Sequence, residues 1–60
     1  MMDASMKISR QGDLIWVRNL RHIDLDVIVG TVDSVTHPNN LFQIGDPICF
    51  APCEVLDLRE

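Results

Sequence analysis

The chain has few of the residues on which most binding and catalytic motifs depend. Among its 60 residues there is one lysine, there is no tyrosine, and the three glycines are isolated from one another. Isolated glycines exclude a glycine-rich phosphate-binding loop. The formal net charge is −4 and the four arginines are scattered, whereas nucleic-acid binding requires clustered basic residues to neutralise phosphates. We therefore expect no nucleic-acid partner.

Long hydrophobic runs are also missing. No stretch approaches the roughly 18 apolar residues that would span a bilayer, and the N-terminus has an early acid, Asp3, without the apolar core of a secretory signal. The sequence thus predicts a cytoplasmic protein with no membrane contact. We expect a flexible N-terminal segment at residues 1–7 and a single small domain at residues 8–60.

No catalytic constellation stands out. Ser34, His37 and either Asp33 or Asp46 could form a nucleophile, base and orienting acid, but nothing in the sequence brings them together. A chain of this length hardly has room for the pocket of several hundred Å³ that substrates generally occupy. We predict that the protein is not an enzyme, and we assign no catalytic or cofactor-binding residue and no cofactor.

Cysteine and histidine are too few and too dispersed for a convincing metal site. Cys49, Cys53, His22 and His37 supply four possible zinc ligands, but the histidines fall on different predicted loops, whereas structural zinc ligands usually come in close pairs. We expect no bound metal, with Cys49 a small buried hydrophobe and Cys53 a loop thiol. A small-ligand or zinc-binding protein with its site at a dimer seam remains the alternative.

The residues that are abundant favour β-structure. Apolar, often β-branched runs at residues 14–20 and 27–36 predict two strands. Residues 11–13 form an expected turn, residues 21–26 an expected hairpin tip and residues 37–40 an expected loop. Residues 41–44 and 48–50 are predicted to be strands around the turn Gly45-Asp46-Pro47. Gly30, in the middle of a strand, indicates a corner of a small barrel.

The C-terminal segment allows two interpretations. Pro52 could open a turn of helix or 3₁₀ helix followed by an extended tail, which we favour. Residues 54–58 could instead form a short edge strand. With either ending, the sequence predicts an all-β domain, a small and partly open barrel of four to five short strands.

Both confident strands contain consecutive apolar residues, so both of their faces are apolar. One face can line the core, and the other needs a cover that a second copy of the chain would provide. We therefore predict a homodimer whose interface includes Ile15, Trp16, Val17 and Ile28. The alternative is that the N-terminal segment or the C-terminal tail covers this face. For Trp16, a core anchor is favoured over an interface hot spot.

Four short motifs resemble the small bacterial YegJ-like domains of unknown function, and together they span most of residues 11–57. They are Gly-Asp-Leu-Ile-Trp-Val at 12–17, Val-Gly-Thr-Val at 29–32, Ile-Gly-Asp-Pro-Ile-Cys-Phe at 44–50 and Glu-Val-Leu-Asp at 54–57. The resemblance implies an SH3-like barrel and a bacterial or phage source, and it brings no catalytic residues. The chain departs from the pattern at Pro47 and in lacking a closing aromatic residue.

These observations favour a non-enzymatic protein-interaction module that self-associates and also binds a protein partner that the sequence does not identify. A small barrel with an exposed edge could accept an extended peptide as an added strand.

Overall fold

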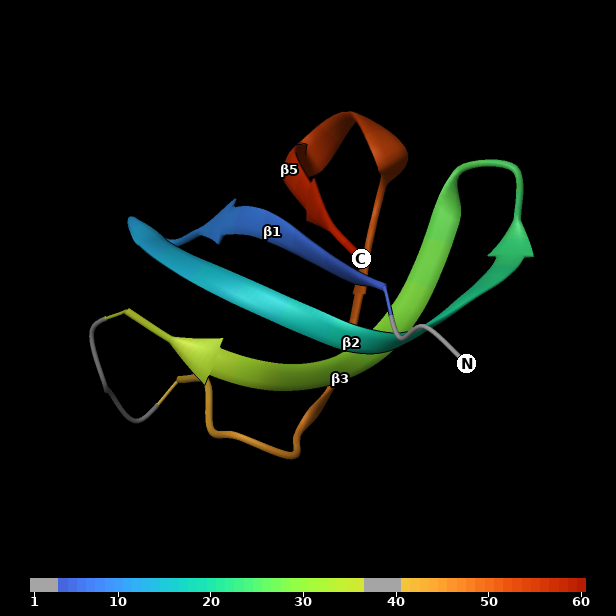
Figure 1. Ribbon diagram of the computed structural model, residues 1–60. Helices are drawn as coiled ribbons and strands as arrows, with labels where there is room; N and C mark the ends of the chain where they lie inside the picture. The colour runs from blue at the N-terminus through green and yellow to red at the C-terminus, as the bar shows by residue number, and fades with distance from the viewer. Residues whose placement is uncertain (1–3, 37–40) are drawn as a thin grey trace.

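The computed structural model describes residues 4–36 and 41–60, and these form one antiparallel sheet of five strands (Figure 1). The strands are β1 Ser5–Arg10, β2 Asp13–Asp24, β3 Val27–Val35, β4 Pro47–Phe50 and β5 Val55–Arg59, and a 3₁₀ turn, η1 Pro52–Glu54, precedes β5. Their order in the sheet is β4-β3-β2-β1-β5, with no closing contact between β4 and β5. The predicted all-β, partly open barrel is confirmed. The expected loop at residues 37–40 lies outside the described residues.

The first hairpin begins earlier than predicted. β1 starts at Ser5, and its residues pair with both β2 and β5. Residues 5–7, expected in the flexible N-terminal segment, instead belong to β1 and have an antiparallel neighbour on each side; Met1–Asp3 are not described. The turn to β2 uses Gln11 (φ 56°) and Gly12 (φ 80°), as a two-residue hairpin turn with positive φ at both positions requires.

β2 is longer than predicted and forms an arm with β3. Residues 21–24, expected in a hairpin tip, continue β2, and only Leu25 and Asp26 form the turn. Register shifts at Arg18/Arg21 and His22/Asp24 interrupt the pairing, so the two-residue alternation that marks a strand is broken at these bulges. We call residues 21–29 the arm. Figure 1 shows it turning away from the line of β1 and the first half of β2.

Gly30 marks the corner at which the arm begins, as predicted. Two residues of β2, Asn19 and Leu20, lie opposite Gly30, and Asn19 has a φ of 54°. A Cβ atom at position 30 would lie 2.5 Å from Val17 Cγ1 and 2.7 Å from the Arg18 carbonyl oxygen. The absence of a side chain therefore permits the close approach of β2 and β3 at the bend.

Residues 41–44 do not form the predicted strand. The Asp46 amide donates to the Gln43 carbonyl (3.0 Å), and the Gln43 amide donates to Asp46 Oδ2 (3.1 Å). The Gly45 amide then donates to the Val32 carbonyl (2.8 Å), which attaches the turn to β3. The predicted turn is present, but the strand that follows it pairs with β3 rather than with residues 41–44.

The C-terminal segment combines both interpretations. η1 is the expected 3₁₀ turn, and the extended tail is β5, which pairs antiparallel with β1. The favoured prediction is confirmed, and the tail is also an edge strand. Throughout the described ranges, 4–36 and 41–60, no helix has the length and hydrophobicity needed to cross a bilayer.

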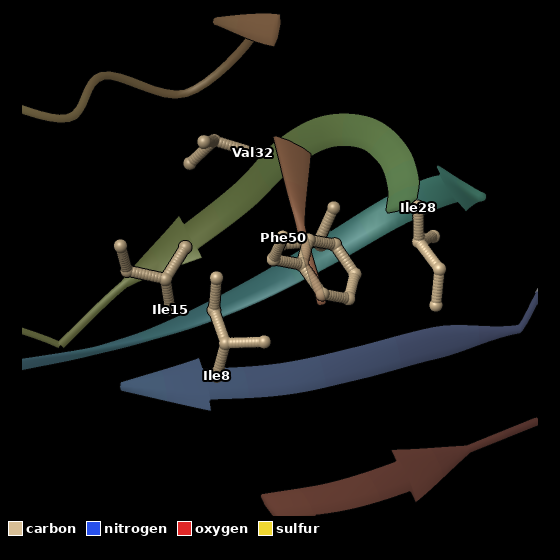
Figure 2. Close-up of a cluster of buried hydrophobic side chains, with 6 residues drawn as sticks. Ile8, Ile15, Ile28, Val32 and Phe50 are labelled. Atoms are coloured by element: carbon tan, nitrogen blue, oxygen red, sulfur yellow. The ribbon is translucent and has the colours of Figure 1, made fainter. Parts of the chain in front are cut away.

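The core lies on the inner face of the curved sheet. It consists of six buried side chains from four strands: Ile8, Ile15, Val17, Ile28, Val32 and Phe50. Figure 2 shows Phe50 of β4 among the isoleucines of β1, β2 and β3. This packing corrects the predicted interface, because Ile15 and Val17 are 0% exposed and Ile28 is 1% exposed. Side chains buried in one subunit cannot form a contact with another.

A cluster of charged contacts around Arg10 and Glu54, which we call the clasp, joins β1 to β4 and η1. Arg10 Nη2 at the end of β1 donates to the Cys49 carbonyl of β4 (3.2 Å) and to Glu54 Oε1 (2.9 Å). The Ala51 amide donates to the other carboxylate oxygen, Glu54 Oε2, at 2.7 Å. These contacts hold η1 and β4 against β1, where the sheet itself supplies no hydrogen bonds.

Glu54→Gln is expected to lower the free energy of unfolding by about 1 kcal/mol at neutral pH. The hydrogen bond from the Ala51 amide, and then the bond and charge of Arg10, hold the pKa of Glu54 below its ordinary value of 4.5. A carboxyl group whose pKa is lower in the folded state than in the unfolded state stabilises the protein at pH values above its unfolded-state pKa. That contribution disappears as the pH falls through the folded value.

Urea unfolding of both proteins at neutral pH and well below pH 4.5 measures this contribution. The difference between the parent protein and Glu54→Gln should be present at neutral pH and close to zero in acid. Glu60→Gln, at the exposed end of the chain, is the control. A Glu54→Gln deficit that persists unchanged in acid would contradict the ionic role of the clasp.

Candidate functional site

Trp16 is the one residue of the predicted interface that is not in the core, and it lies on the outer face of the sheet. It is half-buried, and two cations cover it: the Arg59 guanidinium lies 4.3 Å from the ring centroid and the Lys7 ammonium 5.7 Å. Such contacts stabilise both the ring and the cation. Trp16 is therefore not the core anchor that we favoured. Side chains of β1 and of the C-terminal strand cover it, as in the alternative to a dimer.

The suggested zinc ligands do not come together within the described residues. Cys49 and Cys53 are free and exposed, so the prediction of a buried Cys49 is wrong. Cys49 pairs with Val29, while its neighbour Phe50 occupies the core; adjacent residues of a strand point to opposite faces. His37 is not described, and residues 4–36 and 41–60 contain no cluster of three His, Cys, Asp or Glu side chains suited to a metal ion.

The residues suggested for nucleophilic catalysis have structural contacts instead. Asp33 Oδ1 lies 3.4 Å from Arg18 Nε in an ion pair. Asp46 closes the turn before β4 through its contact with Gln43. Ser34 is exposed on β3, opposite Trp16.

Charged side chains contact backbone groups of both edge strands of the sheet. Arg10 donates to the Cys49 carbonyl of β4, and the Leu58 amide of β5 donates to Asp57 Oδ1 at 2.8 Å. Such contacts, and charges on an edge generally, discourage the addition of another strand. An exposed face of the sheet is therefore a better candidate for binding than either edge.

The strongest candidate face is the outer side of the arm together with β4. Strand pairing places Arg21, Val29 and Cys49 in one row across β2, β3 and β4, and it places Arg18, Thr31 and Pro47 in the next. Between these rows lies a hollow of about 570 Å³, lined by Asn19, Leu20, Arg21, Val29, Gly30, Thr31 and Pro47. We call this surface the arm face.

A second hollow extends the first along β4. It measures about 270 Å³, is mainly apolar, and shares Val29 and Pro47 with the larger one, adding Ile48 and Cys49. Neither hollow is an enclosed pocket of the kind that substrates generally occupy, so the expectation of hardly any room for such a pocket stays a prediction. Both hollows are open to solvent rather than enclosed.

The arm face carries a guanidinium that has no anionic partner among residues 4–36 and 41–60. Of the two arginines on adjacent rows, Arg18 forms an ion pair with Asp33. No carboxylate of the described residues lies within ion-pair distance of Arg21, which borders the hollow. A guanidinium beside a partly apolar hollow can bind a partner that presents an apolar group next to a carboxylate.

The sequence contained part of the signal for this site. The run Val27-Ile28-Val29 is apolar on both faces, but Ile28 is the buried member and the two valines flank it on the other face. The contributions of Arg21 and Pro47 could not be foreseen, because the predicted hairpin tip and turn gave no reason to place them beside these valines.

The comparisons with known proteins do not bear on the resemblance to YegJ-like domains. The resemblance to YegJ-like domains therefore stays a prediction. Compared with protein-family models, curated proteins and solved structures, the chain matches none.

Proposed function

We propose that the protein is a non-enzymatic protein-interaction module that binds through the arm face. The observation that carries this proposal is the open surface over β3 and β4, where the hollow bordered by Arg21 continues into a mainly apolar one. Within the described residues Arg21 forms no ion pair. Interface centres are rich in apolar side chains and arginine.

A cytoplasmic location belongs to the same proposal, supported by two free, exposed cysteines that a reducing compartment would preserve.

The shape of the hollow favours a protein partner over a small molecule. Sites for small molecules are usually concave enough to enclose most of the ligand surface. Here the hollow is open to solvent along the surface of three strands, β2, β3 and β4. A protruding side chain from another protein surface fits such a site, with the surrounding residues in contact around it.

Site-specific photo-crosslinking from position 31 tests the proposal. Thr31 lines the hollow, and Ser9, exposed on β1 away from the arm, is the matched control position. In cell extract, a photoreactive residue at position 31 should give a discrete protein adduct, and one at position 9 should not. Val29→Asp, which places a charge in the apolar hollow, should abolish the adduct at position 31.

The absence of any adduct dependent on Val29 would reject the arm face as a protein-binding site.

Metal analysis of the purified protein separates this proposal from the alternative. Stoichiometric zinc, lost when Cys49 and Cys53 are replaced by serine, would favour the small-ligand or metal-binding function instead.

A further inference from the structure

We propose that the arm face binds the tip of the same arm in a second copy of the chain, so that two copies form a reciprocal dimer. This inference rests on the proposed function of the arm face and names its partner. It follows from the chemistry of the arm tip, from the charge at the hollow and from the distance between them.

The arm tip presents an apolar side chain between two acids. Leu25 is 89% exposed, the largest value among the exposed large hydrophobic residues of the described chain. Asp24 Oδ1 accepts a hydrogen bond from the Leu25 amide (2.7 Å) and so holds the turn. Asp26, the other flanking acid, is exposed and forms no ion pair within the described residues. The exposed side chain of Leu25 is therefore available for a contact with another molecule.

The hollow offers the complementary groups. Val29 and Pro47 provide the apolar surface for a leucine side chain, and Arg21 provides the cation for an aspartate. The chain as a whole is acidic, with a formal net charge of −4, so a pairing of Arg21 with Asp26 of another copy would offset part of the repulsion between two copies. Opposite charges placed across a contact fix its orientation.

The position of the tip relative to the hollow permits a closed dimer. Leu25 and Val29 are four residues apart along β3 and its turn, or about 13 Å at the rise of an extended chain. A two-fold axis between them would place each tip on the hollow of the other copy. Ile23, 63% exposed and between the two sites, would be covered by the same contact. An interface of this kind uses the same surface twice and stops at two subunits.

Sedimentation velocity across the micromolar concentration range tests the dimer. We expect the parent protein to dimerise reversibly and Leu25→Ser to raise the dissociation constant by about tenfold or more, as loss of a central apolar anchor does. Ile44→Ser is the matched control, since Ile44 is 68% exposed but lies in the turn before β4. It should leave the dissociation constant unchanged. Far-ultraviolet circular dichroism verifies that each variant is folded.

A charge exchange tests the orientation. Arg21→Glu and Asp26→Arg should each weaken the dimer about tenfold. The chain with both substitutions again places opposite charges across the seam and should recover most of the affinity. A Glu60→Arg control, away from the arm, should have no such effect in combination with Arg21→Glu.

Three results would overturn the reciprocal dimer: a parent chain that is monomeric throughout the range, a dimer insensitive to Leu25→Ser, or a double variant no better than the singles.

The crosslinking experiment keeps this inference separate from the proposed function. An adduct at position 31 with twice the mass of the chain supports the dimer, whereas an adduct with a different protein supports the interaction module and contradicts self-association.

Discussion

Gly30→Ala is expected to destabilise the fold by about 3 kcal/mol, the upper end of the usual cost of overpacking a tight site. The added Cβ would meet Val17 Cγ1 at 2.5 Å and the Arg18 carbonyl oxygen at 2.7 Å. The first contact is with a fully buried side chain, and the second is with backbone in the neighbouring strand. Neither atom can move without disturbing the core or the corner between β2 and β3.

The effect is large compared with the stability available. A chain of 60 residues has an expected free energy of unfolding of roughly 3 to 9 kcal/mol. Urea unfolding followed by circular dichroism should show Gly30→Ala with a much lower midpoint, or unfolded without denaturant. Ser34→Ala, an exposed position on the same strand, is the control. A Gly30→Ala protein as stable as the control would refute the close approach at this corner.

Ile15→Ala and Leu14→Ala are expected to differ sharply although the two residues are adjacent on β2. Ile15 is fully buried among the core residues of Figure 2, whereas Leu14 is 38% exposed on the other face. Removing the buried side chain should cost about 2 to 5 kcal/mol, through lost burial and a cavity. Removing the exposed one should cost about 1 kcal/mol or less.

Urea unfolding measures both variants. The experiments should be run at two protein concentrations, because any association with a second copy would add to the apparent stability. Equal losses for the two variants would show that both faces of β2 are buried, contrary to the fold described above. A larger loss for Leu14→Ala would reverse the assignment of inner and outer faces.

The predicted dimer interface shows where sequence reasoning reached its limit. The apolar character of both strand faces is real, with Ile15 and Val17 inside and Leu14 and Trp16 outside. A run of consecutive apolar residues contains both sets, and a shift of one residue exchanges them. Three of the four residues predicted at the interface were therefore core residues. The apolar side chains that remain exposed are spread over the molecule. Ile23 and Leu25 lie within residues 21–26, which were expected to form a polar hairpin tip, and the others are Leu14, Leu41, Ile44, Leu56 and Leu58.

Sequence reasoning predicted the turns and the corner correctly at three places where a few neighbouring residues determine the backbone conformation. The two-residue turn at Gln11 and Gly12, the corner at Gly30 and the 3₁₀ turn after Ala51 all follow from residues that favour those conformations by themselves. Residues 41–44 failed the same reasoning, since hydrogen bonds from their turn to Val32 of β3 replaced the expected strand pairing.

The sequence by itself determined an all-β chain with its turns and its corner, because strand propensity and turn geometry act over a few residues. The tertiary structure alone decided which apolar face is buried, how the arm extends beyond the core and where Arg21 meets the hollow of Val29 and Pro47. The clasp of Arg10 and Glu54 likewise joins residues 44 positions apart. Such contacts depend on strand order, bulges and register, which are set by the packing of the whole chain rather than by any local segment.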